Sequence, residues 1–130
     1  MAIDLTRIFK TCYSIINATN GRNLSSQAKL TTNYWQRMRG LLGTQSLQEG
    51  HGLVIDHCYS VHTFGMTYAI DVAFITRNLL ILHEIHSMKP CRISRLVMRS
   101  YAVIELPAGT LLRSDTSVGD QLRFEPHFPP

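Results

Sequence analysis

Cysteine, charge and long apolar runs are all scarce in this chain of 130 residues. The three cysteines Cys12, Cys58 and Cys91 are odd in number and lack Cys-x-x-Cys spacing, which excludes a disulfide framework and predicts reduced thiols. Only 17% of the residues are charged, which is untypical of a disordered chain or a coiled coil. No apolar run could span a membrane, and Asp4 interrupts the N-terminal apolar stretch of a would-be secretory signal. We therefore expect a cytoplasmic protein that makes no membrane contact.

Lysine is scarce too, with three Lys against ten Arg and a net charge of +4. Arginine pairs well with carboxylates and phosphates, so an anionic partner would suit this composition. The densest basic stretch holds Lys89, Arg92, Arg95 and Arg99, but Tyr101 is the one aromatic residue near it. Nucleic-acid binding needs aromatic residues interleaved with charge or a larger basic face, so a solvated or salt-bridged loop is the preferred interpretation.

The chain is 45% hydrophobic, enough to bury the core of one domain without disulfides or metal. We predict a single β-rich domain over residues 11–125, with tails at residues 1–10 and 126–130. Cys91–Ser100 fits neither a helix nor a strand clearly. Seven short segments combine apolar or alternating patterns with flanking turn residues and are predicted to be strands: Thr11–Asn17, Leu24–Leu30, Leu53–Ile55, Ile70–Ile75, Leu79–Ile85, Tyr101–Leu106 and Gln121–Phe124.

One segment has helical spacing instead. Trp35, Met38, Leu41 and Leu42 recur at i, i+3, i+6 and i+7, which predicts one conspicuous amphipathic helix near Tyr34–Leu42. Seven predicted strands beside this single helix indicate a mainly β fold. The expected architecture is a compact, jelly-roll-like β-sandwich or barrel that buries the apolar stripe of the helix.

Several short motifs occur in a fixed order along the chain. They are Arg39–Gly43, Gly52-Leu53, Val61–Met66, Ile70–Ile75, Glu105–Gly109 and Gly119-Asp120. In this order they resemble the family known as domain of unknown function 192, over roughly Thr11 to Glu125. The resemblance implies a small β-sandwich or barrel with one helix, and it carries over no activity. Many relatives have Glu-Arg where this chain has Gln36-Arg37, and Trp-Met where it has Phe64-Gly65-Met66. Any role of an acidic residue at the start of this helix is therefore not carried over to this chain.

Asp71 is the most informative single residue, because it lies between Ile70 and Val72 at the head of an apolar run. A buried carboxylate needs hydrogen bonds or a cation. Backbone N–H groups, Thr63, His62 or Arg39 could supply them. Asp71 is therefore either a structural acceptor of backbone hydrogen bonds or a ligand-binding or catalytic group.

His62 lies in Ser60–Phe64, whose alternation predicts a strand with Val61 turned toward the core. At roughly 3.3 Å per residue, His62 would lie about 13 Å from Cys58 and from Met66. A Ser-His-Asp triad would thus need contact across strands, and no nucleophile-elbow pattern supports one. No spacing of histidine, cysteine and acidic residues matches a zinc pattern, so we expect neither a metal nor a cofactor.

Two functions of different class remain open. The preferred one is a non-catalytic binding module for a small polar ligand or a protein partner, with candidate ligand-binding residues His62, Phe64, Met66, Asp71 and Arg39. The alternative is a small hydrolase or metal-dependent enzyme that uses His62 and Asp71. An enzyme should bring these two side chains within about 3 Å of each other or of a shared water or ion.

Overall fold

The computed structural model describes residues 12–31 and 47–127. The described part forms one seven-stranded sheet and a short helix, α3, at Thr110–Arg113. The strands are β1 Cys12–Asn17, β2 Asn23–Thr31, β3 His51–Asp56, β4 Ile70–Ile75, β5 Ile81–Met88, β6 Ala102–Pro107 and β7 Leu122–His127.

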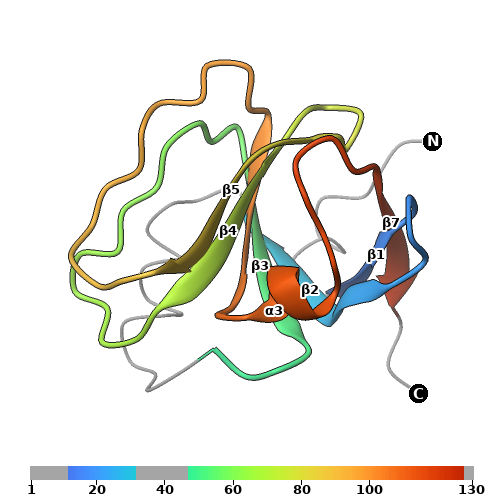
Figure 1. Ribbon diagram of the computed structural model, residues 1–130, viewed down its shortest axis with the longest axis horizontal. Helices are drawn as coiled ribbons and strands as arrows, with labels where there is room; N and C mark the ends of the chain where they lie inside the picture. Colours follow the sequence, from blue (N-terminus) through green and yellow to red (C-terminus); the bar gives the residue numbers. More distant parts are fainter. Residues whose placement is uncertain (1–11, 32–46, 128–130) are drawn as a thin grey trace.

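The sheet runs in the order β5-β4-β6-β3-β2-β1-β7, and every neighbouring pair is antiparallel except β2 and β3. It curls so that the two edge strands approach each other at one end. There Leu80 and Gln121 form a bridge, and the Leu122 N–H donates to the Leu79 carbonyl at 2.9 Å. The result is a partly closed barrel, with α3 in the lower centre of the view in Figure 1.

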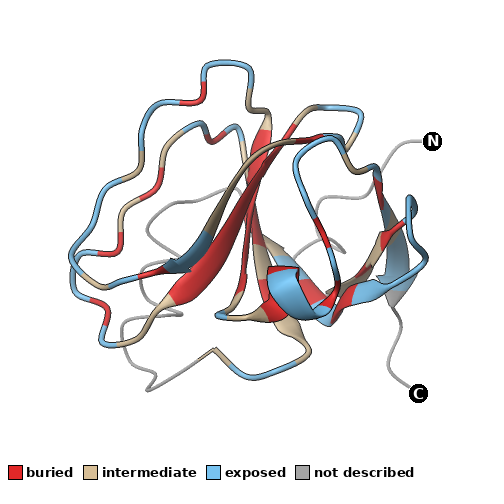
Figure 2. Ribbon diagram, viewed as in Figure 1, coloured by how far each residue is buried: buried red, intermediate tan, exposed pale blue. Residues whose placement is uncertain are grey.

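The curled sheet separates two apolar clusters. The barrel core fills the concave side and takes residues from every strand, such as Ile15, Val54 and Ile104. The outer cluster lies on the other face of β3, β4 and β6, with Ile55, Val72 and Val103 among its members. β4 and β6 are buried on both faces, as their colour in Figure 2 shows, which explains why they have near-continuous apolar sequences.

Gly52, a motif residue on β3, has a packing reason to be glycine. A β-carbon there would lie 3.1 Å from Oγ of Ser25 and 3.2 Å from Cδ2 of Leu106. The strands at this point are therefore too close for a larger residue without some displacement of these neighbours.

The mainly β fold is confirmed, and each of the seven observed strands overlaps a predicted one. β7 continues to His127, past the predicted domain end at residue 125. The helix near Tyr34–Leu42 lies outside the described residues. α3 was not predicted, because one turn is too short to show a helical period. No helix in the described part is long and apolar enough to cross a membrane.

The prediction of a strand at Ser60–Phe64 is wrong. Its pairing is reduced to one isolated bridge, between His62 and Ile93. The alternation is nevertheless physically meaningful, because Val61 and Thr63 are buried while Phe64 is exposed. An extended loop lying on a packed layer produces the same pattern as a half-buried strand.

Candidate functional site

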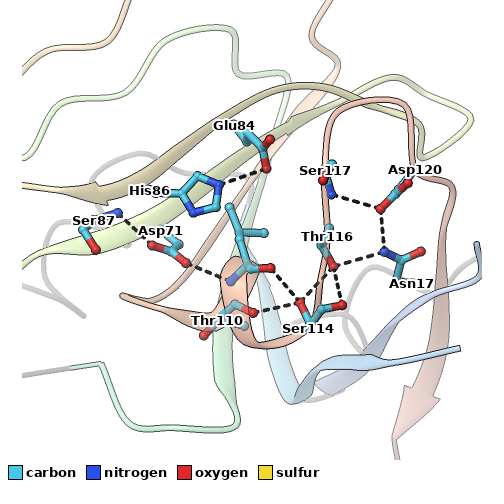
Figure 3. Close-up of polar contacts among 11 residues, drawn as sticks. Asn17, Asp71, Glu84, His86, Ser87, Thr110, Ser114, Thr116, Ser117 and Asp120 are labelled. Carbon is cyan, nitrogen blue, oxygen red and sulfur yellow. Dashed lines mark hydrogen bonds and ion pairs between the residues drawn. The ribbon is translucent and has the colours of Figure 1, made fainter. Parts of the chain in front are cut away.

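Asp71 is completely buried, and each of its carboxylate oxygens accepts a backbone hydrogen bond. The Ser87 N–H donates to Oδ1 at 2.8 Å, and the Leu111 N–H donates to Oδ2 at 2.9 Å (Figure 3). Ser87 has a positive φ of 50°, next to an irregularity in the pairing of β4 with β5. Asp71 therefore fixes the end of β5 and the first turn of α3 to the start of β4.

The contacts of Asp71 belong to a wider polar network at this end of the barrel. The Ser114 hydroxyl donates to the Thr110 carbonyl at 2.8 Å and lies 2.8 Å from the hydroxyl of Thr116. Asn17 donates to Thr116 Oγ1 at 3.0 Å and to Asp120 Oδ2 at 2.9 Å. Figure 3 shows these side chains beside α3, where they join β1, α3 and the segment that leads to β7.

His62 and Phe64 lie together on the surface. Their rings stack with centroids 4.9 Å apart, and the Phe64 N–H donates to Nδ1 of His62 at 3.3 Å. Met66, two residues after Phe64, is buried and belongs to the outer cluster. These three predicted site residues thus share one region of the molecule.

Asp71 does not belong to that region. Its neighbours Ile70 and Val72 face the outer cluster with Met66, whereas Asp71 alternates with them and faces the opposite side of β4, as does Ala73. The structure therefore places His62 and Asp71 on different sides of the sheet. The remaining predicted site residue, Arg39, lies outside the described residues.

The sequence did not single out Glu105, although its motif was noted. Glu105 is fully buried in the middle of β6, between Leu53 of β3 and Val72 of β4. The sequence does contain a signal for the burial of Glu105, because this acidic residue interrupts the apolar run Ala102–Leu106. Its full burial places this carboxylate within the packed layer.

His57 and Cys58 have separate surroundings despite their adjacency. His57 is exposed, with Nδ1 3.3 Å from Oδ2 of Asp56 and its ring 5.0 Å from that of Tyr101. Cys58 is buried, and its thiol donates to the Ser60 carbonyl at 3.1 Å. Across residues 12–31 and 47–127, no group of three or more His, Cys, Asp or Glu side chains could hold a metal ion.

Two long loops cover the outer cluster. They comprise residues 57–69 and 89–101, here called the loop pair, and run side by side at the left of Figure 1. Backbone hydrogen bonds of 2.8 Å join Thr63 to Arg92, Ser94 to Val61, and Val97 to Tyr59. The loop pair is thus a built surface layer with defined inward and outward sides.

The inward side holds Val61, Thr63, Met66 and Val97, all of which are buried. The outward side carries large apolar side chains, which are 48–75% exposed: Tyr59, Phe64, Ile93, Leu96 and Met98. Lys89, Arg92, Arg95 and Arg99 are exposed on the same loops. We call these nine residues the loop-pair surface, which is both apolar and basic.

The positive charge of this surface affects His83, a residue of β5. The pKa of His83 is lowered, first because burial disfavours the charged imidazolium and second because the Arg95 guanidinium repels it, while Glu84 opposes the shift. Arg95 therefore lies close enough to His83 on β5 to disfavour its charged form.

Comparison with known proteins agrees with this description. The model of the DUF192 family, described as "Uncharacterized ACR, COG1430", matches residues 15–124. A UPF0127 protein of Thermococcus sibiricus is 24% identical over 115 residues, which span 85% of this chain and 74% of the relative.

Two crystal structures are similar in fold. One is a Sinorhizobium meliloti protein provisionally named a transcription regulator, with a TM-score of 0.72, 24% identity, and coverage of 88% of this chain and 92% of that one. The other, a protein of unknown function from Novosphingobium aromaticivorans, has a TM-score of 0.71, 13% identity, and coverage of 86% and 83%. At these identities the two likenesses establish the shared fold alone.

Proposed function

The chain belongs to the DUF192 family, and from its own surface we propose that it is a non-catalytic binding module for a protein partner. The observation that carries this proposal is the loop-pair surface. Five large apolar side chains stand 48–75% exposed on two loops whose other sides are buried. A concentration of exposed apolar side chains of this kind is typical of an interaction site.

The hydrogen bonds that join the two loops of the loop pair support the same function. Thr63 holds the two loops together through both its backbone and its side chain, since its hydroxyl donates to the Lys89 carbonyl at 2.6 Å and accepts the Arg92 N–H at 3.0 Å. Surface held in place before binding loses little conformational entropy when a partner docks. Exposed apolar residues on such a layer are therefore suited to recognition.

The charges define the partner's chemistry. Three arginines and one lysine are interspersed with the apolar residues of the loop-pair surface. Arginine forms bidentate pairs with carboxylates, and it is enriched where proteins meet. The complementary partner presents acidic residues interleaved with leucine, isoleucine or phenylalanine.

The position of Asp71 favours a binding module over an enzyme. An acid–base pair of His62 and Asp71 would need both groups at one open cleft. Asp71 is instead fully buried, with both oxygens engaged by the Ser87 and Leu111 N–H groups. His62 then contributes to recognition through its stacked face with Phe64.

The proposal can be tested by selecting peptides from a random display library on the folded protein and measuring their affinities by fluorescence anisotropy. We expect the enriched peptides to combine Asp or Glu with large apolar residues. The double variant Leu96→Ser/Met98→Ser should bind them at least about tenfold more weakly, because two apolar anchors are lost.

A matched control is available in Leu112→Ser/Val118→Ser, which removes two apolar side chains of similar exposure away from the loop pair. This control should bind the peptides like the wild type. Equal binding by both double variants, or enrichment of peptides without acidic residues, would refute the proposal. Selective binding of anionic lipid vesicles or duplex DNA in place of acidic peptides would also refute it.

A further inference from the structure

A cavity of about 330 Å³ opens at the end of the barrel opposite α3. It lies where β3 and β4 end and β6 begins, since Asp56, Ile75 and Ala102 are paired neighbours there and all line it. Its aliphatic wall includes Val54 and Ile75 of the barrel core. The loop-pair surface is a separate feature, so the cavity is independent of the function proposed above.

The cavity combines aromatic rings with one carboxylate. Tyr13, Tyr101 and Phe124 line it, and the rings of Tyr13 and Phe124 are tilted by 44° with centroids 6.2 Å apart. Among the lining residues that the structure describes, Asp56 is the charged one, and its side chain is 21% exposed. We propose that this cavity is a binding site for a small organic cation with an apolar body.

The residues that line the cavity determine which kind of ligand it favours. Aliphatic and aromatic side chains favour an apolar body, and the faces of aromatic rings attract cations. The ring of Tyr101 already has the Arg77 guanidinium 4.9 Å from its centroid, so the cation of a ligand would lie against the rings of Tyr13 and Phe124. A half-buried carboxylate is screened by solvent less than an exposed one, so Asp56 would favour a cation over a neutral molecule of the same shape and disfavour an anion.

Two probes of matched shape test the charge preference. They are 3-hydroxyphenyltrimethylammonium and 3-tert-butylphenol, in which a tert-butyl group replaces the trimethylammonium group. Each is titrated into the isotopically labelled full chain and followed by two-dimensional NMR. We expect shifts at Tyr13, Ile75, Ala102 and Phe124, and about tenfold tighter binding of the cation, because cation–π and ionic attraction act only on it.

The variant Asp56→Asn should reduce that preference to about twofold, the part that the aromatic rings contribute, because the shape of the cavity is kept while its charge is removed. The control Asp115→Asn removes one acidic charge from an exposed residue next to α3, and should leave the preference unchanged. The comparison of the two probes on the wild type needs no variant to fold. Equal affinities there, shifts away from the cavity, or a preference undiminished in Asp56→Asn would each overturn the proposal.

Discussion

Asp71 shows how a single buried carboxylate can hold three parts of a barrel in place. It lies on β4, and its oxygens accept N–H groups from Ser87 at the end of β5 and from Leu111 in α3. The substitution Asp71→Ala should lower the free energy of unfolding by about 3 kcal/mol, because two N–H groups lose their acceptors at about 1–3 kcal/mol each. Urea unfolding followed by circular dichroism measures this change.

Asp71→Asn is the graded control for that prediction. Its amide keeps one acceptor oxygen but turns an N–H₂ group toward the other backbone donor, so its stability should lie between those of the wild type and Asp71→Ala. If Asp71→Ala unfolds at the wild-type urea concentration, the structural role of this carboxylate is wrong.

A second prediction at this scale concerns His83. Burial, and then Arg95, lower the pKa of this imidazole in the folded chain below 6.5. At a pH between the folded and the unfolded pKa, the unfolded chain therefore binds more protons than the folded one. The contribution of His83 to stability should therefore rise with pH through that window and decline as the pH falls. Arg95→Gln should raise the pKa of His83, as read from an NMR titration of its ring protons.

Arg99→Gln removes the same charge from the same loop and serves as the control, because Arg95 is the arginine that acts on His83. A wild-type pKa at or above 6.5 would contradict the burial argument. Equal pKa values of His83 in the two arginine variants would contradict the role of Arg95.

The residue scale also shows where sequence reasoning reaches its limit. That Asp71 is buried and needs hydrogen-bond partners follows from its apolar neighbours Ile70 and Val72. The identity of a partner such as Leu111 does not, because it lies forty residues further along the chain and is brought near by α3. Glu105 interrupts the apolar run Ala102–Leu106 in the same way, so its burial could have been predicted by the argument applied to Asp71.

At the scale of elements, local patterns predict strands well, because a strand of this sheet must bury at least one face. They do not distinguish Ser60–Phe64 from a strand, because the loop pair buries alternate residues without a ladder. The distinguishing property is the partner segment, which touches this one at a few backbone positions around Thr63 and Arg92. Such pairing depends on tertiary structure that local sequence does not encode.

The loop pair gives the element-scale prediction. Thr63→Val keeps the volume of the side chain but removes the hydroxyl that joins Lys89 and Arg92. Amide hydrogen exchange at Arg92 and Ser94 should become about tenfold faster, because losing these bonds costs about 1–3 kcal/mol of local stability. Thr63→Ser retains the hydroxyl and should keep exchange slow at both positions, so equally fast exchange in the two variants would contradict the prediction.

At the scale of the whole molecule, the barrel is closed by few contacts. β5 and β7 are the edge strands, and they meet through the Leu80–Gln121 bridge and through an Ile81 N–H that donates to the Asp120 carbonyl at 3.0 Å. Asn17 braces this closure from β1, because its side chain donates to Thr116 and Asp120. One buried amide thus joins the start of the described chain to the segment that leads into its last strand.

Asn17→Ala should therefore weaken closure as well as local packing. We expect the free energy of unfolding to fall by about 2–4 kcal/mol, since Asn17 is fully buried and the buried hydroxyl of Thr116 loses a donor. Amide exchange at Ile81 and Leu122 should accelerate, because these N–H groups close the gap between the edge strands.

Asn20→Ala provides the matched comparison. Asn20 also bonds to the segment before β7, through the carbonyls of Ser114 and Asp115, but it is exposed, so water replaces the lost bonds and the cost should stay below about 1 kcal/mol. If the two variants lose equal stability, the hydrogen bonds of Asn17 act only as local turn contacts. If Asn17→Ala alone accelerates exchange at Ile81, the closure of the barrel depends on this buried side chain.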